Sequence, residues 1–190
     1  MTSWFDRLGE YFPIQEMKSL PHMKALLADK PEQYRVAEAK EYVTVYLEKD
    51  SFIFVDFMLV SPGQRSSGVG SRVIEDMKSK GKPIVLEVEP ETPDDPDTGK
   101  RIRFYEKLGF RRVESIRYVR THVVTGMLNI MDVYCWSPKP VTDEWVYERM
   151  KESYEQVHAY RSEEYYGKFP QPVDEVLSLT LPSRPTIRQA

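Results

Sequence analysis

Between Tyr34 and Trp136 the hydrophobic pattern switches between two periods, and this limits the folds open to the chain more than any other feature. From Tyr34 to Val60 apolar residues recur at about every second position, as they do in half-buried strands. The link Lys49-Asp50-Ser51 is short and polar, as a hairpin turn requires. The pattern therefore predicts an antiparallel meander of three strands, near residues 34–37, 43–47 and 52–60.

Helical and strand patterns alternate after this meander. A helix is predicted over 71–80, where the apolar residues share one face and Gly81 ends the pattern. The predicted fold class is α+β: a mixed, mostly antiparallel sheet with flanking helices, in which parallel pairing is needed only around the central crossover. The remaining predicted elements are a strand over 84–88, a helix over 100–108, and two strands over 113–123 and 127–136.

We expect one domain over residues 1–140, whose first 33 residues are helical, and a helix with a proline-containing tail over 141–190. Ser3 is a candidate cap of a short first helix, and the helical stretch after it is interrupted near Pro21. Beyond Thr142 an apolar stripe predicts a helix that docks on its own domain or on a second subunit, as in a homodimer. From Lys168 onward prolines break all periodicity, which indicates a tether or a disordered end.

Composition excludes several classes of protein. The 190 residues include 27 Lys and Arg against 30 Asp and Glu, so the chain has no basic surplus for nucleic acid. The one cysteine, Cys135, and three scattered histidines indicate neither a disulfide framework nor a metal site. The first twelve residues lack the apolar run of a signal peptide, and no segment reaches the length of a membrane span. We therefore expect a cytoplasmic protein without nucleic-acid or membrane partners.

The most specific stretch of the sequence, residues 60–71, places glycines between a strand and the start of a helix. Unpaired backbone N–H groups at such a place bind phosphate, and Gly68 and Gly70 allow a close approach to the backbone. Arg65 would add a charged hydrogen bond. A P-loop needs a lysine after its last glycine, and a dinucleotide fingerprint needs a third glycine where Val73 stands, so both are disfavoured. A tight turn without a ligand is the alternative.

A second stretch, residues 101–110, forms an amphipathic helical pattern closed by Gly109 and followed by a strand. Taken together, the two stretches resemble the GNAT superfamily of acyl-CoA-dependent N-acetyltransferases. The first looks like the pyrophosphate loop Arg-x-x-Gly-x-Gly, and the run Phe-Tyr-Glu-Lys-Leu-Gly-Phe over 104–110 looks like the second hallmark. Their order and the strand between them also match, and the resemblance covers about residues 34–136.

This resemblance implies acetyl transfer from acetyl-CoA to a primary amine of a small molecule or peptide, by direct attack in a ternary complex. It also implies that two central parallel strands, 52–60 and 84–88, splay apart to admit the co-substrate. Tyr105 would lie beside the sulfur, while the backbone of Leu59 and Val60 would pair with the pantetheine arm and polarise the thioester carbonyl. The pyrophosphate would be held by Arg65 and by the backbone of Ser66, Ser67, Gly68, Val69, Gly70 and Ser71.

Acetyl transfer to an amine needs a proton donor and a proton acceptor. The Tyr105 hydroxyl is the candidate donor to the departing thiolate; the alternative is an aromatic residue packed in the core. Three carboxylates are candidate acceptors: Glu87 and Glu89, which point to one face of their strand, and Asp56, which interrupts an apolar run. Glu87 is preferred, as the base or as a group that orients the acceptor. The alternative for Asp56 is a structural role, in which it caps a β-bulge or meets an arginine.

The acidic loop over 89–97 either attracts a cationic substrate or is simply solvated. The sequence thus predicts an N-acetyltransferase that uses acetyl-CoA as co-substrate. A non-catalytic acyl-CoA-binding module, acting as a sensor or scaffold, is the alternative. Both would bind the co-substrate, so only turnover separates them.

Overall fold

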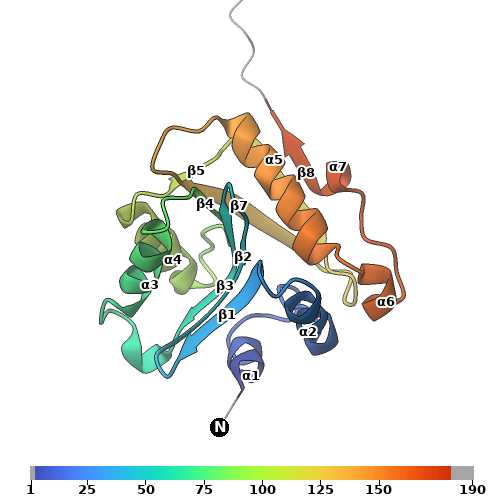
Figure 1. Ribbon diagram of the computed structural model, residues 1–190, viewed down its shortest axis with the longest axis horizontal. Helices are drawn as coiled ribbons and strands as arrows, with labels where there is room; N and C mark the ends of the chain where they lie inside the picture. Colours follow the sequence, from blue (N-terminus) through green and yellow to red (C-terminus); the bar gives the residue numbers. More distant parts are fainter. Residues whose placement is uncertain (1–2, 181–190) are drawn as a thin grey trace, which may run out of the picture.

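The computed structural model describes residues 3–180, which form one eight-stranded sheet with helices on both faces (Figure 1). The strand order is β1-β2-β3-β4-β7-β6-β8, and β5 pairs with β7 outside this path. The strands are β1 (Tyr34–Ala39), β2 (Tyr42–Glu48), β3 (Ile53–Val60), β4 (Ile84–Val88), β5 (Arg111–Arg112), β6 (Ile116–Thr121), β7 (Leu128–Trp136) and β8 (Leu177–Leu179).

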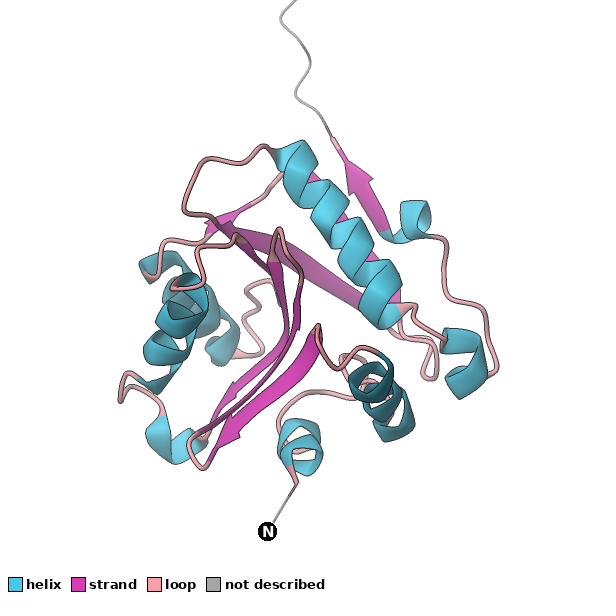
Figure 2. Cartoon of the chain, viewed as in Figure 1, coloured by secondary structure: helices cyan, strands magenta, loops and turns pink. Residues whose placement is uncertain are grey.

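The helices divide between the two faces of the sheet (Figure 2). On one face α3 and α4 bury Ile74 and Tyr105 in a cluster with inward residues of β3 and β4. On the other face α1, α2 and α5 form the larger cluster, which contains Leu8, Met23 and Val146. The helices are α1 (Trp4–Gly9), α2 (Leu20–Asp29), η1 (Pro62–Gln64), α3 (Val69–Lys78), α4 (Pro96–Lys107), α5 (Asp143–Ser153), η2 (Tyr154–His158), α6 (Ser162–Tyr166) and α7 (Val173–Val176).

The predicted fold class is confirmed, because the sheet is mixed and only β3 and β4 pair in parallel. The β1-β2-β3 meander is antiparallel throughout. The parallel pairing of β3 with β4 is short: it runs from Ile53 opposite Ile84 to Val55 opposite Leu86 and then stops. Beyond that point β3 continues along β2 and β4 continues along β7. The two central strands therefore separate at their carboxyl ends.

A β-bulge lies at the point of separation. Val45 of β2 is opposite Phe57, and the next residue, Tyr46, is opposite Val55, so Asp56 has no partner on β2. A bulge bends its strand and increases the local twist. The bend in β3 begins one residue after its last pair with β4, which accounts for the place where the sheet opens.

Two predicted helix boundaries are wrong. The second helix is not interrupted near Pro21: it begins at Leu20, with Ser19 as its N-cap and the proline in its first turn, where a missing N–H costs nothing. The fourth helix begins at Pro96 rather than near 100, because the Asp95 side chain caps it by accepting from the N–H of Asp97. The acidic loop is thus partly the start of a helix.

The chain after Pro140 adds to the fold. Val146, Met150 and Val157 of the predicted stripe are buried in the larger cluster. The prediction of a tether from Lys168 onward is wrong for α7 and β8, since β8 pairs antiparallel with β6 and extends the sheet. The proline-containing end over 182–185 lies outside the described residues. No helix within residues 3–180 is long and apolar enough to cross a membrane.

A buried ion pair fastens the segment before α2 to the bulge. Lys18 Nζ donates to Oδ1 and Oδ2 of Asp56 at 2.6 and 2.8 Å, and the Tyr34 hydroxyl donates to Oδ2 as well. Both side chains of the pair are almost fully buried. Burial lowers the pKa of Lys18, and the attraction of Asp56 offsets only part of that effect.

Breaking this pair from one side should be costly. Asp56→Asn or Lys18→Met is expected to lower the free energy of unfolding by about 3–5 kcal/mol, because each leaves a buried charge without its partner. The double variant should lose less than the sum of the two single losses. Urea denaturation measures all three, with Lys24→Met on the exposed face of α2 as the control. Additive losses would show that the two residues act independently.

Candidate active site

The glycine loop leads into a helix start whose backbone donors are free. Gly68 is the N-cap of α3 with φ of 81°, and no side chain caps the helix. The first amide that bonds within the helix is that of Arg72, which donates to the carbonyl of Gly68. The N–H groups of Val69, Gly70 and Ser71 thus start a helix of ten residues with no capping partner within residues 3–180. Such a helix start favours an anion.

The two glycines of the motif serve different purposes. A Cβ at Gly68 would have space, so this position needs glycine for its left-handed backbone. A Cβ at Gly70 would lie 3.0 Å from the ring of Phe104, so that glycine allows α3 to pack closely on α4. Ser66 also has a positive φ, of 69°, and the Ser67 hydroxyl donates to the carbonyl of Gln64 at 2.6 Å. These contacts keep the loop tightly turned.

Arg65, the predicted phosphate ligand, is paired with a residue of α4. Its guanidinium donates to the carboxylate of Asp97 at 3.0 Å and stacks 5.0 Å from the centroid of the Tyr11 ring. Both members of the ion pair are more than a third exposed. A pair of this kind contributes little to stability and can be exchanged for another anion.

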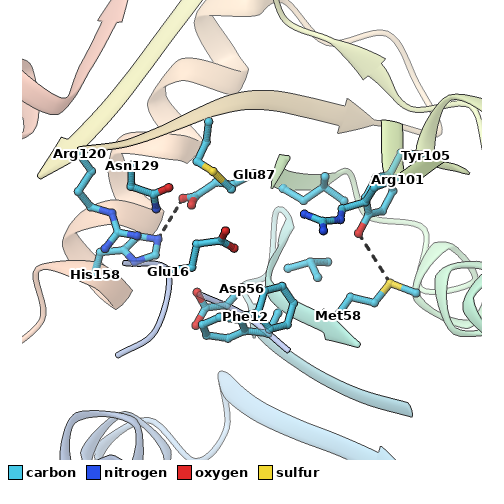
Figure 3. Close-up of a pocket in the computed structure, with 14 residues that line it drawn as sticks. Phe12, Glu16, Asp56, Met58, Glu87, Arg101, Tyr105, Arg120, Asn129 and His158 are labelled. Carbon is cyan, nitrogen blue, oxygen red and sulfur yellow. Dashed lines mark hydrogen bonds and ion pairs between the residues drawn. The ribbon is translucent and has the colours of Figure 1, made fainter. Parts of the chain in front are cut away.

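The opening between β3 and β4 contains a small cavity of about 40 Å³ (Figure 3). Met58 on β3 and Tyr105 on α4 lie at one end of it, and Arg120 on β6 and His158 on η2 lie at the other. The carboxylate of Glu16 lies between these two ends. Leu59 and Val60 follow on β3, where the edge that faces β4 has no strand partner within residues 3–180.

Tyr105 lines this cavity with its hydroxyl. The nearest partner of the hydroxyl is the Sδ atom of Met58 at 3.9 Å, which is a weak acceptor. Burial raises the pKa of Tyr105 to about 12. The phenol is therefore protonated at neutral pH and has a proton free to donate into the cavity.

Glu87 on β4 also faces the cavity, in a pair with histidine. Its Oε1 lies 3.0 Å from Nε2 of His158. Burial raises the pKa of Glu87 and, together with the nearby cations Lys18 and Arg120, lowers the pKa of His158. A neutral His158 then donates its Nε2 proton to Glu87 and holds the carboxylate in place. Asp56, the second predicted carboxylate, has both oxygens engaged by Lys18 and Tyr34.

The carboxylate of this cavity that has no partner within residues 3–180 is Glu16, which the sequence did not single out. Its side chain is 9% exposed and has no hydrogen-bonding or ion-pair partner within residues 3–180. Burial, with repulsion from Glu89, raises the pKa of Glu16 to about 7, although Arg101 partly opposes the shift. A carboxylate of this pKa accepts and releases a proton at neutral pH. The segment between α1 and α2 delivers it to the cavity.

The third predicted carboxylate, Glu89, lies beyond β4 and pairs with Arg101 at 3.4 Å. It lines an acidic cleft of about 490 Å³ that adjoins the cavity and shares Glu16 and Arg101 with it. Five carboxylates line this acidic cleft: Glu10, Glu16, Glu89, Asp95 and Asp97.

Sequence patterns did not indicate Glu16, Arg120 or His158. Glu16 lies in a turn between two short helices, and His158 lies on η2, which continues α5. Both reach the cavity through contacts between segments distant in the sequence. For Arg120 the sequence carries a weak signal. Arg120 has the same parity in its strand as the buried residues Ile116 and Tyr118, where an apolar residue is expected.

The geometry therefore brings together a helix start with uncapped amides, an opening between two strands, a protonated phenol and a carboxylate with a pKa of about 7. A phenol can supply a proton to a leaving group, and a free carboxylate can take one from a nucleophile. This combination suits transfer of a group from a phosphate-containing donor to a protonated acceptor.

Comparison with known proteins agrees with this geometry. Residues 30–112 match the family described as the acetyltransferase (GNAT) domain. YjbC of Bacillus subtilis (strain 168), which carries the name of an acetyltransferase, is 45% identical over 177 residues, 93% of this chain and 92% of that protein. A solved structure from Bacteroides thetaiotaomicron, named for the GNAT family, superposes with a TM-score of 0.62. It covers 85% of this chain and 88% of its own at 24% identity, a likeness of fold.

The raised pKa of Glu16 should appear in the pH dependence of stability. The folded pKa of about 7 lies above the ordinary value of 4.5 for a glutamate, so folding favours the protonated form. Stability from this group is then complete below pH 4.5 and is lost as the pH rises to about 7, by roughly 3 kcal/mol. Glu16→Gln stays neutral and should unfold at a higher temperature than the native protein above pH 7, but not at pH 4.

Thermal unfolding from pH 4 to 8.5 measures this difference. Glu10→Gln is the matched control, because Glu10 lines the same acidic cleft but is exposed. A constant difference between Glu16→Gln and the native protein across this range would contradict the raised pKa.

Proposed function

Because this chain belongs to the GNAT family of acetyltransferases, we propose that it moves the acetyl group of acetyl-CoA to a primary amine by direct attack in a ternary complex. The observation that carries the proposal is the opening between β3 and β4, with free helix amides at its mouth and Tyr105 and Glu16 inside. The acceptor is a small-molecule or peptide amine. Acetyl-CoA supplies the activated acetyl group as a thioester.

The residues around the opening fit this co-substrate. The amides of Val69, Gly70 and Ser71 offer donors to a pyrophosphate, and Arg65 offers a cation once it leaves Asp97. The unpaired edge of β3 at Leu59 and Val60 offers backbone groups to the amides of a pantetheine arm. An arm extended along this edge would lead from the helix start toward Met58 and Tyr105.

Three proton movements complete the reaction. The acceptor enters as an ammonium ion and must lose a proton before its nitrogen can attack. We assign this proton to Glu16, whose pKa of about 7 allows it to be ionised at neutral pH and still basic enough to accept. As the C–N bond forms and the C–S bond breaks, the Tyr105 hydroxyl donates its proton to the departing sulfur. The attacking nitrogen then gives its second proton to the Tyr105 phenolate, which leaves a neutral amide and a free thiol, and Glu16 releases its proton to water. Glu87, held by His158, lies alongside and orients the acceptor.

Release of free CoA thiol across a panel of amines tests the function. The proposal predicts thiol release that depends on the amine and an N-acetylated product detected by mass spectrometry. Binding of acetyl-CoA without release for any amine would favour the non-catalytic alternative. Absence of acetyl-CoA binding in calorimetry would remove the proposal entirely.

Arg65 and Asp97 should have opposite effects on co-substrate binding. Arg65→Ala removes a cation from the phosphates and is expected to weaken acetyl-CoA binding roughly tenfold. Asp97→Asn removes the competing partner of Arg65 and should tighten binding a few-fold. Titration calorimetry measures both, with Asp94→Asn as the control because Asp94 is exposed and lies outside the cleft. Weaker binding by Asp97→Asn would show that the ion pair shapes the loop for the ligand.

Tyr105→Phe removes only the hydroxyl and should leave the packing of α4 unchanged. A hydroxyl that acts on the leaving group matters only in the transition state, so kcat and kcat/KM should fall together, on the order of ten- to a thousandfold. Acetyl-CoA affinity should stay within about twofold of the native value. Tyr46→Phe, which deletes a hydroxyl from the same cluster away from the cavity, is the control. Near-normal turnover by Tyr105→Phe would make Tyr105 a packing residue.

Glu16→Gln should lower the rate of acetyl transfer and abolish the pH dependence of kcat/KM near neutral pH. If Glu16 accepts the proton, kcat/KM of the native enzyme rises with pH and levels off above a pKa of about 7. The variant should lose about a hundredfold or more in rate, and that ascending limb should disappear. Glu87→Gln serves as the comparison. If its ascending limb disappears instead, the base is Glu87.

A further inference from the structure

A second cavity, of about 230 Å³, opens at the end of the active-site cavity away from Tyr105. The two cavities share Arg120 and His158. The second cavity lies between the end of β6 and the segments around α6, on the sheet face opposite α3 and α4. A molecule bound there would reach Glu16 from the side that the co-substrate loop leaves free. We call it the basic cavity, for the reason that follows.

Among residues 3–180 no carboxylate lines the basic cavity, which sets it apart from the acidic cleft. Its ionised side chains are Lys18, Arg120 and Lys168. Lys18 is neutralised by Asp56, and Lys168 lies at the exposed mouth, where it donates to the carbonyl of Val123 at 3.1 Å. The two histidines of the lining, His122 and His158, have pKa values lowered by burial and are neutral at pH 7.

Arg120 is the buried charged group of the basic cavity that has no partner within residues 3–180. Its Nε atom is buried and has no hydrogen-bonding partner, and its guanidinium forms no ion pair within residues 3–180. The nearby carboxylates are engaged elsewhere, Glu87 by His158 and Asp56 by Lys18. Burying a guanidinium away from water costs folding free energy unless an anion pairs with it. Its planar fork suits a carboxylate or a phosphate.

We propose that the acceptor is a small amine that carries an anionic group, a carboxylate or a phosphate, and that Arg120 binds this group in the basic cavity. The order along the site is then Tyr105 at the thioester, Glu16 at the amine and Arg120 at the anionic end of the acceptor (Figure 3). The inference rests on the proposed acetyl transfer and narrows its substrate class.

The same lining disfavours an acceptor that carries positive charges alone. A polyamine has no anionic group to meet Arg120 in this cavity. It would need the acidic cleft, which lies on the side of the co-substrate loop, where Asp97 meets Arg65.

Matched pairs of amines test the proposal with the full chain and saturating acetyl-CoA. Each pair differs in the anionic group alone: phenylalanine and phenethylamine, lysine and 1,5-diaminopentane, phosphoethanolamine and ethanolamine. The anionic member of at least one pair should be acetylated with a kcat/KM at least tenfold above that of its partner. The pair that responds tells a carboxylate from a phosphate. Preference for the members without the anionic group would overturn the inference and leave acetyl transfer intact.

Arg120→Gln should lower kcat/KM for the preferred anionic amine by ten- to a hundredfold, mainly through KM, and leave the partner amine within about twofold. Arg120→Lys keeps the charge without the fork and should recover part of the loss. Arg117→Gln, on the exposed face of the same strand, is the control. Equal losses for both members of a pair would overturn the assignment of Arg120.

Binding provides a readout that does not depend on turnover. Calorimetry of the CoA-saturated protein with the same amines should show binding of an anionic member that Arg120→Gln weakens at least tenfold. If no amine releases CoA but this binding is seen, the proposed acetyl transfer fails and the anion site stands. Absence of binding by every anionic amine would overturn the site.

Discussion

The buried ion pair between Lys18 and Asp56 is the contact on which the active-site cavity depends. It joins the segment before α2 to the bulge of β3, and these two parts of the chain are 38 residues apart. Glu16 lies two residues before Lys18, so the pair also fixes the carboxylate that faces the cavity. A buried ion pair is a poor source of stability compared with apolar residues of similar size. Its value here is positional, because an apolar contact would allow the segment to slide.

The bulge at Asp56 also explains why the sheet opens where it does. The parallel pairing of β3 and β4 ends at Val55 and Leu86, next to the extra residue. Each strand keeps its outer partner, so the meander and the β4-β7 pair stay intact on either side. The gap costs few hydrogen bonds, since it affects only the carboxyl ends of two short strands. The helix α3, which begins at Val69, packs on the same face of the sheet as Tyr105.

Sequence patterns predicted those parts of the site that lie within a few consecutive residues. Gly68 needs a left-handed backbone and Tyr105 sits on one amphipathic helix, so both are visible in a few consecutive residues. Glu16 and Arg120 owe their position to contacts with distant segments, and no period marks them. The same reason explains β8, whose three residues become a strand only because β6 has a free edge. The predicted interruption near Pro21 and the predicted helix start near Lys100 are wrong, because Pro21 and Pro96 occupy the first turns of α2 and α4.

The buried ionisable groups around the cavity are of two kinds. Each either has a hydrogen-bonding or ionic partner in the protein or faces the space where a ligand would bind. Asp56 is matched by Lys18, and Glu87 is matched by His158. Glu16 and Arg120 are left unmatched, one on each side of the acceptor path, and both withdraw charge from water at a cost to stability. The cost at Glu16 is the same desolvation that raises its pKa to about 7. With a fully solvated or ion-paired base the protein would be more stable. The pKa of that base would then be too low for it to take a proton from an amine.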